Sequence, residues 1–185
     1  MAYCERKDSK RLVIDADVAR SASQQETDTA VSVAHQCRNL LLTVFTACHS
    51  IVMTQAIYDE WQHHQSNFAR EWYVRMKRRG HKVVWIKDTT TNERLHQRIR
   101  QLADNEKHRD AMLKDVHLLE AALQTDGIII SRDAVRQLFV ALAIREGEIR
   151  RIIWINPTID YEQVIIWLNN GAPYDEKRTL GYQQA

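Results

Sequence analysis

Four acidic residues lie where the chain is expected to end a strand or begin a helix: Asp15, Glu60, Asp115 and Asp133. Asp15 directly follows the run RLVI, and Asp133 lies two residues after Ser131, the last residue of the run GIIIS. Because the carboxyl ends of neighbouring parallel strands meet at one edge of a sheet, Asp15 and Asp133 are expected to face one crevice. Glu60 and Asp115 are expected to reach the same edge from the ends of helices.

Carboxylates gathered in this way favour one kind of chemistry. Like charges a few ångströms apart raise one another's pKa, and a bound divalent cation keeps all of them ionised. Oxygen ligands without His or Cys partners select Mg²⁺ or Mn²⁺ over zinc. Such a site hydrolyses phosphodiesters with water that the metal activates. Each acid also has an ordinary alternative, since Asp15 suits a turn, Glu60 a solvated helix face, and Asp115 and Asp133 helix caps.

Five short apolar runs are the expected strands, and they cover Arg11–Ile14, 50–54, 82–86, 127–130 and 152–155. These runs do not alternate between apolar and polar residues, which is typical of strands buried on both faces of a parallel sheet. Helices are expected over 28–47, 55–79, 92–124 with one internal break, 133–146 and 160–169, with Asp28 or Thr29 capping the first. The pattern predicts an α/β fold, with a three-layer α/β/α arrangement around a parallel sheet of about five strands.

Composition indicates one soluble domain but leaves the partner open. The chain has 185 residues, of which 44% are hydrophobic and 27% charged, and its net charge is +2. We expect a single domain over 1–170 and a loosely held tail over 171–185. No run is long and apolar enough for a secretory signal or a membrane span. The cysteines Cys4, Cys37 and Cys48 fit neither a disulfide framework nor a zinc ribbon, which favours a cytoplasmic location.

Several segments together resemble the PIN-domain nuclease family, which includes the VapC-like toxins. They are VIDADV, an acid in the helix after the second strand, KDVHLLEAAL and IIISRD, spread over roughly residues 11–156. In that family four acids on such segments bind the metal, and they correspond to Asp15, Glu60, Asp115 and Asp133. The resemblance implies a PIN-like domain and a Mg²⁺- or Mn²⁺-dependent endoribonuclease that cleaves single-stranded RNA. Many members are toxins that dimerise, so it also implies a small antitoxin protein and a homodimer.

Some positions depart from the family pattern or leave a choice open. Asp17 stands where the family usually has Asn or Ser, so it is either an additional metal ligand or a residue that bonds the backbone of the turn. Glu60 has competitors in Asp59 and Glu71. Ser131 is expected beside the metal ligands rather than among them. The long segment 61–114 bears on the choice of substrate, which the sequence leaves open between RNA and single-stranded DNA.

Basic side chains are the candidates for contact with the nucleic acid. Arg132 and Arg136 flank the predicted metal edge, where they could touch the scissile phosphate. The segment FAREWYVRMKRR offers a second group, in which Trp72 could also stack on a base: Arg75, Lys77, Arg78 and Arg79. A solvated basic face explains this second group equally well.

Other chemistries find less support. His63 and His64 could suggest zinc, but no third nitrogen ligand has a recognisable spacing. His117 and Glu120 have the spacing of carboxylate-bridged iron sites, but only one such pair exists.

Two further functions remain as alternatives. The run VIDADV also resembles the motif of haloacid-dehalogenase-like phosphatases, with Asp15 as nucleophile, Asp17 as acid and base, and Ser131 as a second motif. That family needs a late acidic pair, and the chain offers only Asp160, alone and misplaced. The other alternative is a non-catalytic PIN-like module that binds RNA or a protein.

Overall fold

Five parallel strands form one sheet in the computed structural model, which describes residues 8–23, 32–87 and 91–182. The strands follow the order β3-β2-β1-β4-β5. Their bounds are β1 Arg11–Ile14, β2 Ser50–Met53, β3 Val83–Trp85, β4 Ile128–Ile130 and β5 Ile153–Ile155. Each strand coincides with a predicted apolar run, and most of their side chains are buried because helices cover both faces. The predicted parallel sheet is therefore confirmed.

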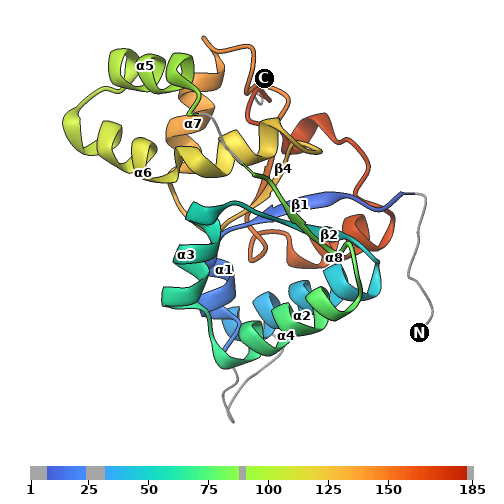
Figure 1. The fold of residues 1–185 in the computed structure, drawn as a ribbon. Helices are drawn as coiled ribbons and strands as arrows, with labels where there is room; N and C mark the ends of the chain where they lie inside the picture. Colours follow the sequence, from blue (N-terminus) through green and yellow to red (C-terminus); the bar gives the residue numbers. More distant parts are fainter. Residues whose placement is uncertain (1–7, 24–31, 88–90, 183–185) are drawn as a thin grey trace.

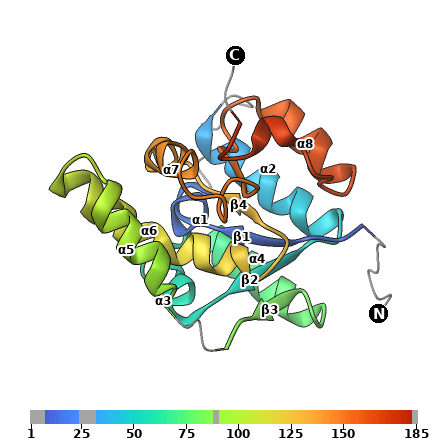
Figure 2. The same ribbon diagram turned by 90° about the horizontal axis from the view of Figure 1, so that it is seen from above.

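Eight α-helices in the described ranges complete three layers. They are α1 Ala16–Ser21, α2 Val33–Thr46, α3 Gln55–His64, α4 Asn67–Arg78, α5 Glu93–Leu102, α6 Glu106–Leu123, α7 Arg136–Ala143 and α8 Tyr161–Asn169. Figure 1 shows α5, α6 and α7 on one face of the sheet and the other helices on the opposite face. On that opposite face α2 packs against both α4 and α8 (Figure 2). The predicted three-layer α/β/α class is confirmed.

The strand order changes direction beside β1. The chain passes from β1 to β2 on one side and later returns to β4 on the other, where Ile14 is level with Ile130. The backbone N–H of Asp15 continues this pairing by donating to the Ile130 carbonyl at 3.0 Å. Ligands of open α/β sheets bind outside the carboxyl ends of the strands at such a switch point. The fold thus sets Asp15 and Ser131 side by side at that edge.

Polar N-caps determine where most helices begin, and they explain two errors in the predicted boundaries. Ser66 accepts a hydrogen bond from the Ala69 N–H at 3.1 Å and starts α4, so the predicted helix over 55–79 is broken in two. Asp15 caps a short helix, α1, that was not predicted. The expected break within 92–124 falls at 103–105, where Asn105 caps α6. Ser32 caps α2, whereas Asp28 and Thr29 lie outside the described residues.

The segment after α8 is packed against the sheet, so the expectation of a loosely held tail is wrong for residues 171–182. Thr179 forms an antiparallel bridge with Ile153 of β5. The Leu180 N–H donates to the Ile152 carbonyl at 2.9 Å, and the Leu180 side chain is fully buried. At Gly181 a Cβ would lie 2.9 Å from the Arg150 carbonyl oxygen, which explains the glycine. This segment therefore forms one wall of the molecule beside the ends of β4 and β5.

The sequence predicts neither a membrane span nor a disulfide. None of the helices described combines the length and apolarity required to cross a membrane. Cys37 is a free, buried thiol, whereas Cys48 is disulfide-bonded. The expectation that the cysteines form no disulfide is therefore wrong for Cys48, while Cys4 lies outside the described residues.

Candidate metal centre

The predicted acids share one cavity of about 150 Å³ at the carboxyl edge of the sheet. Its walls carry five acids, Asp15, Asp17, Glu60, Asp115 and Asp133, together with Arg20, His64 and Lys114. The acids come from segments far apart in the chain: the start of α1, the middle of α3, the middle of α6 and the turn after β4. The expectation that Glu60 and Asp115 stand at helix ends, with Asp115 as a cap, is therefore wrong, since Asn105 caps α6. The structure thus brings together all four predicted metal ligands and Asp17.

Asp15 is both a helix cap and a wall of the cavity. Its Oδ1 accepts a hydrogen bond from the Asp17 N–H at 3.3 Å, and its Oδ2 accepts one from the Ser131 hydroxyl at 2.6 Å. The side chain is buried, and this burial raises its pKa, although the bond from Ser131 acts in the opposite direction. Capping and participation in the site are therefore compatible at this residue.

Asp17 ties the start of α1 to the turn after β4. Its carboxylate accepts a hydrogen bond from the Arg132 N–H, at 3.2 Å for Oδ2. Burial, with a further contribution from the negative charge of Asp15, raises the pKa of Asp17 to about 7. Asp17 thus bonds the backbone of the turn after β4, and not that of its own turn as the sequence alternative had it, and it also lines the cavity.

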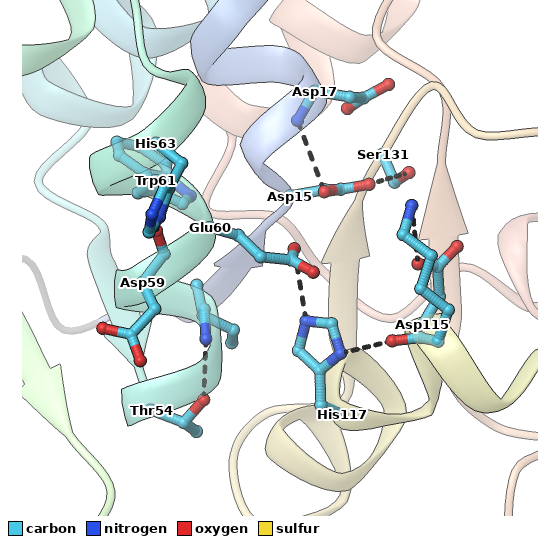
Figure 3. A network of polar contacts seen from close by, with 12 residues as sticks. Asp15, Asp17, Thr54, Asp59, Glu60, Trp61, His63, Asp115, His117 and Ser131 are labelled. Atoms are coloured by element: carbon cyan, nitrogen blue, oxygen red, sulfur yellow. Dashed lines mark hydrogen bonds and ion pairs between the residues drawn. The ribbon is translucent and has the colours of Figure 1, made fainter.

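Two contacts place Glu60 toward the cavity. Thr54 caps α3 by accepting from the Ile57 N–H at 3.2 Å, and the buried Trp61 indole donates to the Ile14 carbonyl at 2.9 Å. The second bond joins α3 to the residue that precedes Asp15. In Figure 3 Glu60 points toward Asp15 and His117, whereas Asp59 lies on the other side of the helix. Glu60, and not Asp59, is therefore the α3 acid that reaches the site.

Asp115 projects from α6 and is only 7% exposed. Burial raises its pKa to about 6, in spite of the nearby Lys114, and the charges of Asp133 and Asp15 raise it further. The Lys114 Nζ lies 3.8 Å from Asp115 Oδ1. Glu71, the other competitor for the Glu60 position, lines a different cavity.

His117 has a role that was not predicted. Its Nε2 lies 3.5 Å from Glu60 Oε2, an ion-pair distance without hydrogen-bond geometry, and its Nδ1 lies 2.9 Å from the Lys114 carbonyl oxygen. The contact with His117 lowers the pKa of Glu60. Burial is the largest single influence and lowers the pKa of His117, but the contacts with Glu60, the Lys114 carbonyl and the charge of Asp115 together raise it above its usual value. Glu120 instead accepts a hydrogen bond from the Asn92 N–H. His117 and Glu120 therefore do not act together as the ligand pair of a carboxylate-bridged iron site.

Ser131 connects two of the acids. It is buried, and its hydroxyl donates to Asp15 and accepts from the Asp133 N–H at 3.0 Å. The Asp133 carboxylate in turn accepts from the Val135 N–H at 2.8 Å. Asp133 therefore belongs to the turn and is exposed, while α7 begins only at Arg136 rather than at 133 as predicted.

Replacing Ser131 by alanine should lower the kcat/KM for RNA cleavage and weaken Mn²⁺ binding by about 10- to 100-fold each, because residues that orient metal ligands have effects of this size. Asp15 would lose the shorter of its two side-chain hydrogen bonds, which holds its carboxylate in one orientation. Ser66→Ala is the matched control, since it removes a hydroxyl that caps α4 away from the cavity. It should reduce stability and leave Mn²⁺ affinity unchanged. Equal Mn²⁺ affinity in Ser131→Ala and the wild type would contradict this role.

The chemistry of the cavity fits a divalent cation. Five carboxylates face only two permanently charged cations, Arg20 and Lys114, and the raised pKa values of Asp15, Asp17 and Asp115 show the cost of holding these charges in a buried site. In the parts of the chain that the structure covers, no three His, Cys, Asp or Glu side chains are grouped closely enough to form a ready coordination shell. Binding of a cation would therefore require these carboxylates to move closer together.

The predicted nucleic-acid contacts fall into two groups. Arg132 and Arg136 lie beside the cavity, in the turn after β4 and at the start of α7. The basic residues of the second group do not line it: Arg75, Lys77, Arg78 and Arg79. They lie at the end of α4 that leads into β3, at the opposite edge of the sheet, where the Arg79 guanidinium covers the Phe45 ring at 3.4 Å. Their position favours the alternative of a solvated basic face.

Comparison with known proteins adds no relative: no family model, no curated protein and no solved structure matches this chain. We therefore infer the function from the residues of the carboxylate cavity and from their geometry.

Proposed function

We propose that the protein is a Mg²⁺- or Mn²⁺-dependent nuclease of the PIN type that hydrolyses phosphodiester bonds in single-stranded RNA. The observation that carries the proposal is the meeting of Asp15, Glu60, Asp115 and Asp133 in one cavity at the switch point of the sheet. These acids are far apart in sequence, and the local role of each, as a cap or a surface residue, does not explain why they meet.

Different residues of the chain would have different roles in such a reaction. The carboxylates of Asp15, Glu60, Asp115 and Asp133 would hold the metal, which would supply activated water and neutralise charge on the phosphate. Ser131 fixes Asp15, and His117 holds Glu60 at its ion-pair distance. Arg132 stands beside the cavity, where a guanidinium can bind a phosphate oxygen. No covalent enzyme intermediate is required.

The biological setting forms a further part of the proposal, and it derives from the resemblance alone. It comprises a toxin role, a small antitoxin protein as partner, and a homodimer. A cytoplasmic location has the least support, because Cys48 is disulfide-bonded and disulfides are rare in reducing compartments.

Incubation of the purified protein with end-labelled single-stranded RNA and DNA, with Mn²⁺, Mg²⁺ or EDTA, tests the proposal. We expect internal cleavage of RNA that requires the divalent cation. Hydrolysis of p-nitrophenyl phosphate without strand cleavage would instead favour the haloacid-dehalogenase-like phosphatase. Binding of RNA without cleavage under any of these conditions would favour the non-catalytic module.

The geometry favours the nuclease over the phosphatase. Each oxygen of Asp15 accepts one hydrogen bond and keeps a second lone pair, which suits a metal ligand as well as a nucleophile, so Asp15 alone does not separate the two functions. Asp17, the acid and base of that alternative, is engaged with the Arg132 N–H. Glu60 and Asp115, which the phosphatase alternative leaves unused, are directed at the same cavity.

A further inference from the structure

A second, larger cavity adjoins the carboxylate cavity. Its volume is about 450 Å³, and the two cavities share Asp133 as a wall residue. It lies outside the carboxyl ends of β4 and β5, and the packed segment that follows α8 closes one side with Lys177 and Arg178. The volume falls within the range of about 300–1,000 Å³ that is usual for small-molecule sites.

The two cavities have opposite charge. The carboxylate cavity has five acids and two permanent cations, whereas the larger cavity has four permanent cations and two acids, Asp133 and Asp160. Arg178 is paired with Asp175 at 3.0 Å, so it contributes little free charge. Of the three other cations, Arg136 and Lys177 form no ion pair with a carboxylate in the described residues, whereas the positive charge of Arg132 also acts on Asp17 of the carboxylate cavity. The larger cavity is therefore a site for an anion.

The guanidinium groups in this cavity have unused capacity to donate hydrogen bonds to an anion. The Arg136 Nε donates to the Trp154 carbonyl at 3.1 Å, which fixes the guanidinium, and its terminal nitrogens have no protein partner in the described residues. Burial without a counter-ion lowers the pKa of Arg136. The Arg132 Nη1 donates to the Ser21 hydroxyl, and its Nε is buried without a hydrogen-bond partner in the described residues. A bound phosphate would supply acceptors for the terminal nitrogens of Arg136.

Two helices add to the positive potential. Arg136 at the start of α7 and Asp160, the residue before α8, line the cavity, and neither helix has a side-chain N-cap. In α7 the N–H groups of Gln137 and Leu138 already bond the carbonyls of Ala134 and Val135, so α8 has the freer N-terminus. Free N–H groups at a helix N-terminus attract anions. The wall is also partly apolar, and Ile159 remains 62% exposed there. An anion with an apolar portion, such as a nucleotide, matches both kinds of wall.

We infer that this cavity is a subsite for the nucleotide adjacent to the scissile bond, with Arg132, Arg136 and Lys177 binding its phosphate and Ile159 contacting its base or ribose. The inference rests on the proposed nuclease function for the identity of the strand. It assigns to Lys177, in a segment outside the region of family resemblance, a direct contact with substrate.

Titration with uridine 5′-monophosphate, followed by NMR of the ¹⁵N-labelled protein in EDTA, tests the subsite without the metal. We expect saturable shifts at the cavity residues, no comparable binding of uridine, and weaker binding of inorganic phosphate. Lys177→Gln and Arg136→Gln should each weaken binding about tenfold, as expected for a lost charged hydrogen bond. Lys107→Gln, which changes an exposed lysine on α6, is the control and should bind like the wild type.

The outcomes separate the subsite from the nuclease. The Lys177 side chain is exposed, and only its backbone N–H forms a hydrogen bond in the described residues, with Asp175, so Lys177→Gln should fold normally even if Arg136→Gln does not. Absence of binding to the wild type, unchanged binding by Lys177→Gln, or phosphate bound as tightly as the nucleotide would overturn the inference. If nucleotide binding is present but RNA is not cleaved, the proposed function fails and the subsite stands. If RNA is cleaved and Lys177→Gln leaves KM unchanged, the subsite fails alone.

Discussion

Asp15→Asn should lower the rate of RNA cleavage by about 10³-fold or more, because a metal centre contributes several kcal/mol to the transition state and each 1.4 kcal/mol is about tenfold in rate. The amide keeps the shape of the side chain and can still accept the bond from Ser131 through its oxygen. It loses the charge that binds the cation. The measurement is the single-turnover rate on end-labelled RNA with saturating Mn²⁺.

Asp59→Asn is the matched control for this loss. Asp59 is one residue from Glu60, but its carboxylate accepts from the Gln55 amide at 2.7 Å and lies on the other side of α3 (Figure 3). Its replacement should leave the rate within about twofold of the wild type, as expected for an exposed group outside the site. A rate loss of the same size in both variants, or in neither, would contradict the role given to Asp15.

Asp115→Asn should stabilise the metal-free protein by roughly 2–3 kcal/mol at pH 8, because a shift of one pKa unit corresponds to about 1.4 kcal/mol. Burial raises the pKa of Asp115 from 3.8 to about 6, so the folded protein holds this proton over a pH range in which the unfolded chain has lost it. The contribution to the free energy of unfolding therefore falls as pH rises from about 4 to about 6 and stays low above that. Asparagine removes the titration and the repulsion.

Urea unfolding in EDTA measures this effect at pH 4 and at pH 8. The variant and the wild type should be similarly stable at pH 4, and the variant should be more stable at pH 8. Asp110→Asn serves as control, because Asp110 lies on the same helix with a side chain that is 64% exposed. It should change little at either pH. An Asp115→Asn variant that is less stable than the wild type at pH 8 would show that this carboxylate stabilises the fold.

The strands could be predicted from the sequence because their signal is local. Unalternated apolar runs such as GIII and RLVI have few other uses in a chain with so few Gly and Pro residues. The helices were predicted less accurately, since a periodic apolar stripe continues across Gln65 even though Ser66 starts a new helix. The serine before Asn67 is a capping signal that periodicity alone does not register.

Some residues of the site could likewise be predicted from the local sequence, whereas others depend on packing between distant segments. Asp15, Asp115 and Asp133 could be selected from their positions at the ends of strands and in an apolar-periodic helix. The choice of Glu60 over Asp59 depends on the bond from Trp61 to Ile14, which no spacing in the sequence reveals. The pairing of His117 with Glu60 and the closing of the larger cavity by Lys177 depend on packing between segments far apart in the chain.

Calorimetric titration of the metal-free protein with Mn²⁺ at pH 8 tests the central claim most directly, namely that the carboxylate cavity is a divalent-metal site. We expect saturable binding to the wild type and at least tenfold weaker binding to Asp115→Asn. Binding to the wild type should also be weaker at pH 5.5, because the raised pKa values of Asp17 and Asp115 favour their protonated forms there. Absence of binding at pH 8, or equal affinity in the wild type and Asp115→Asn, would contradict it.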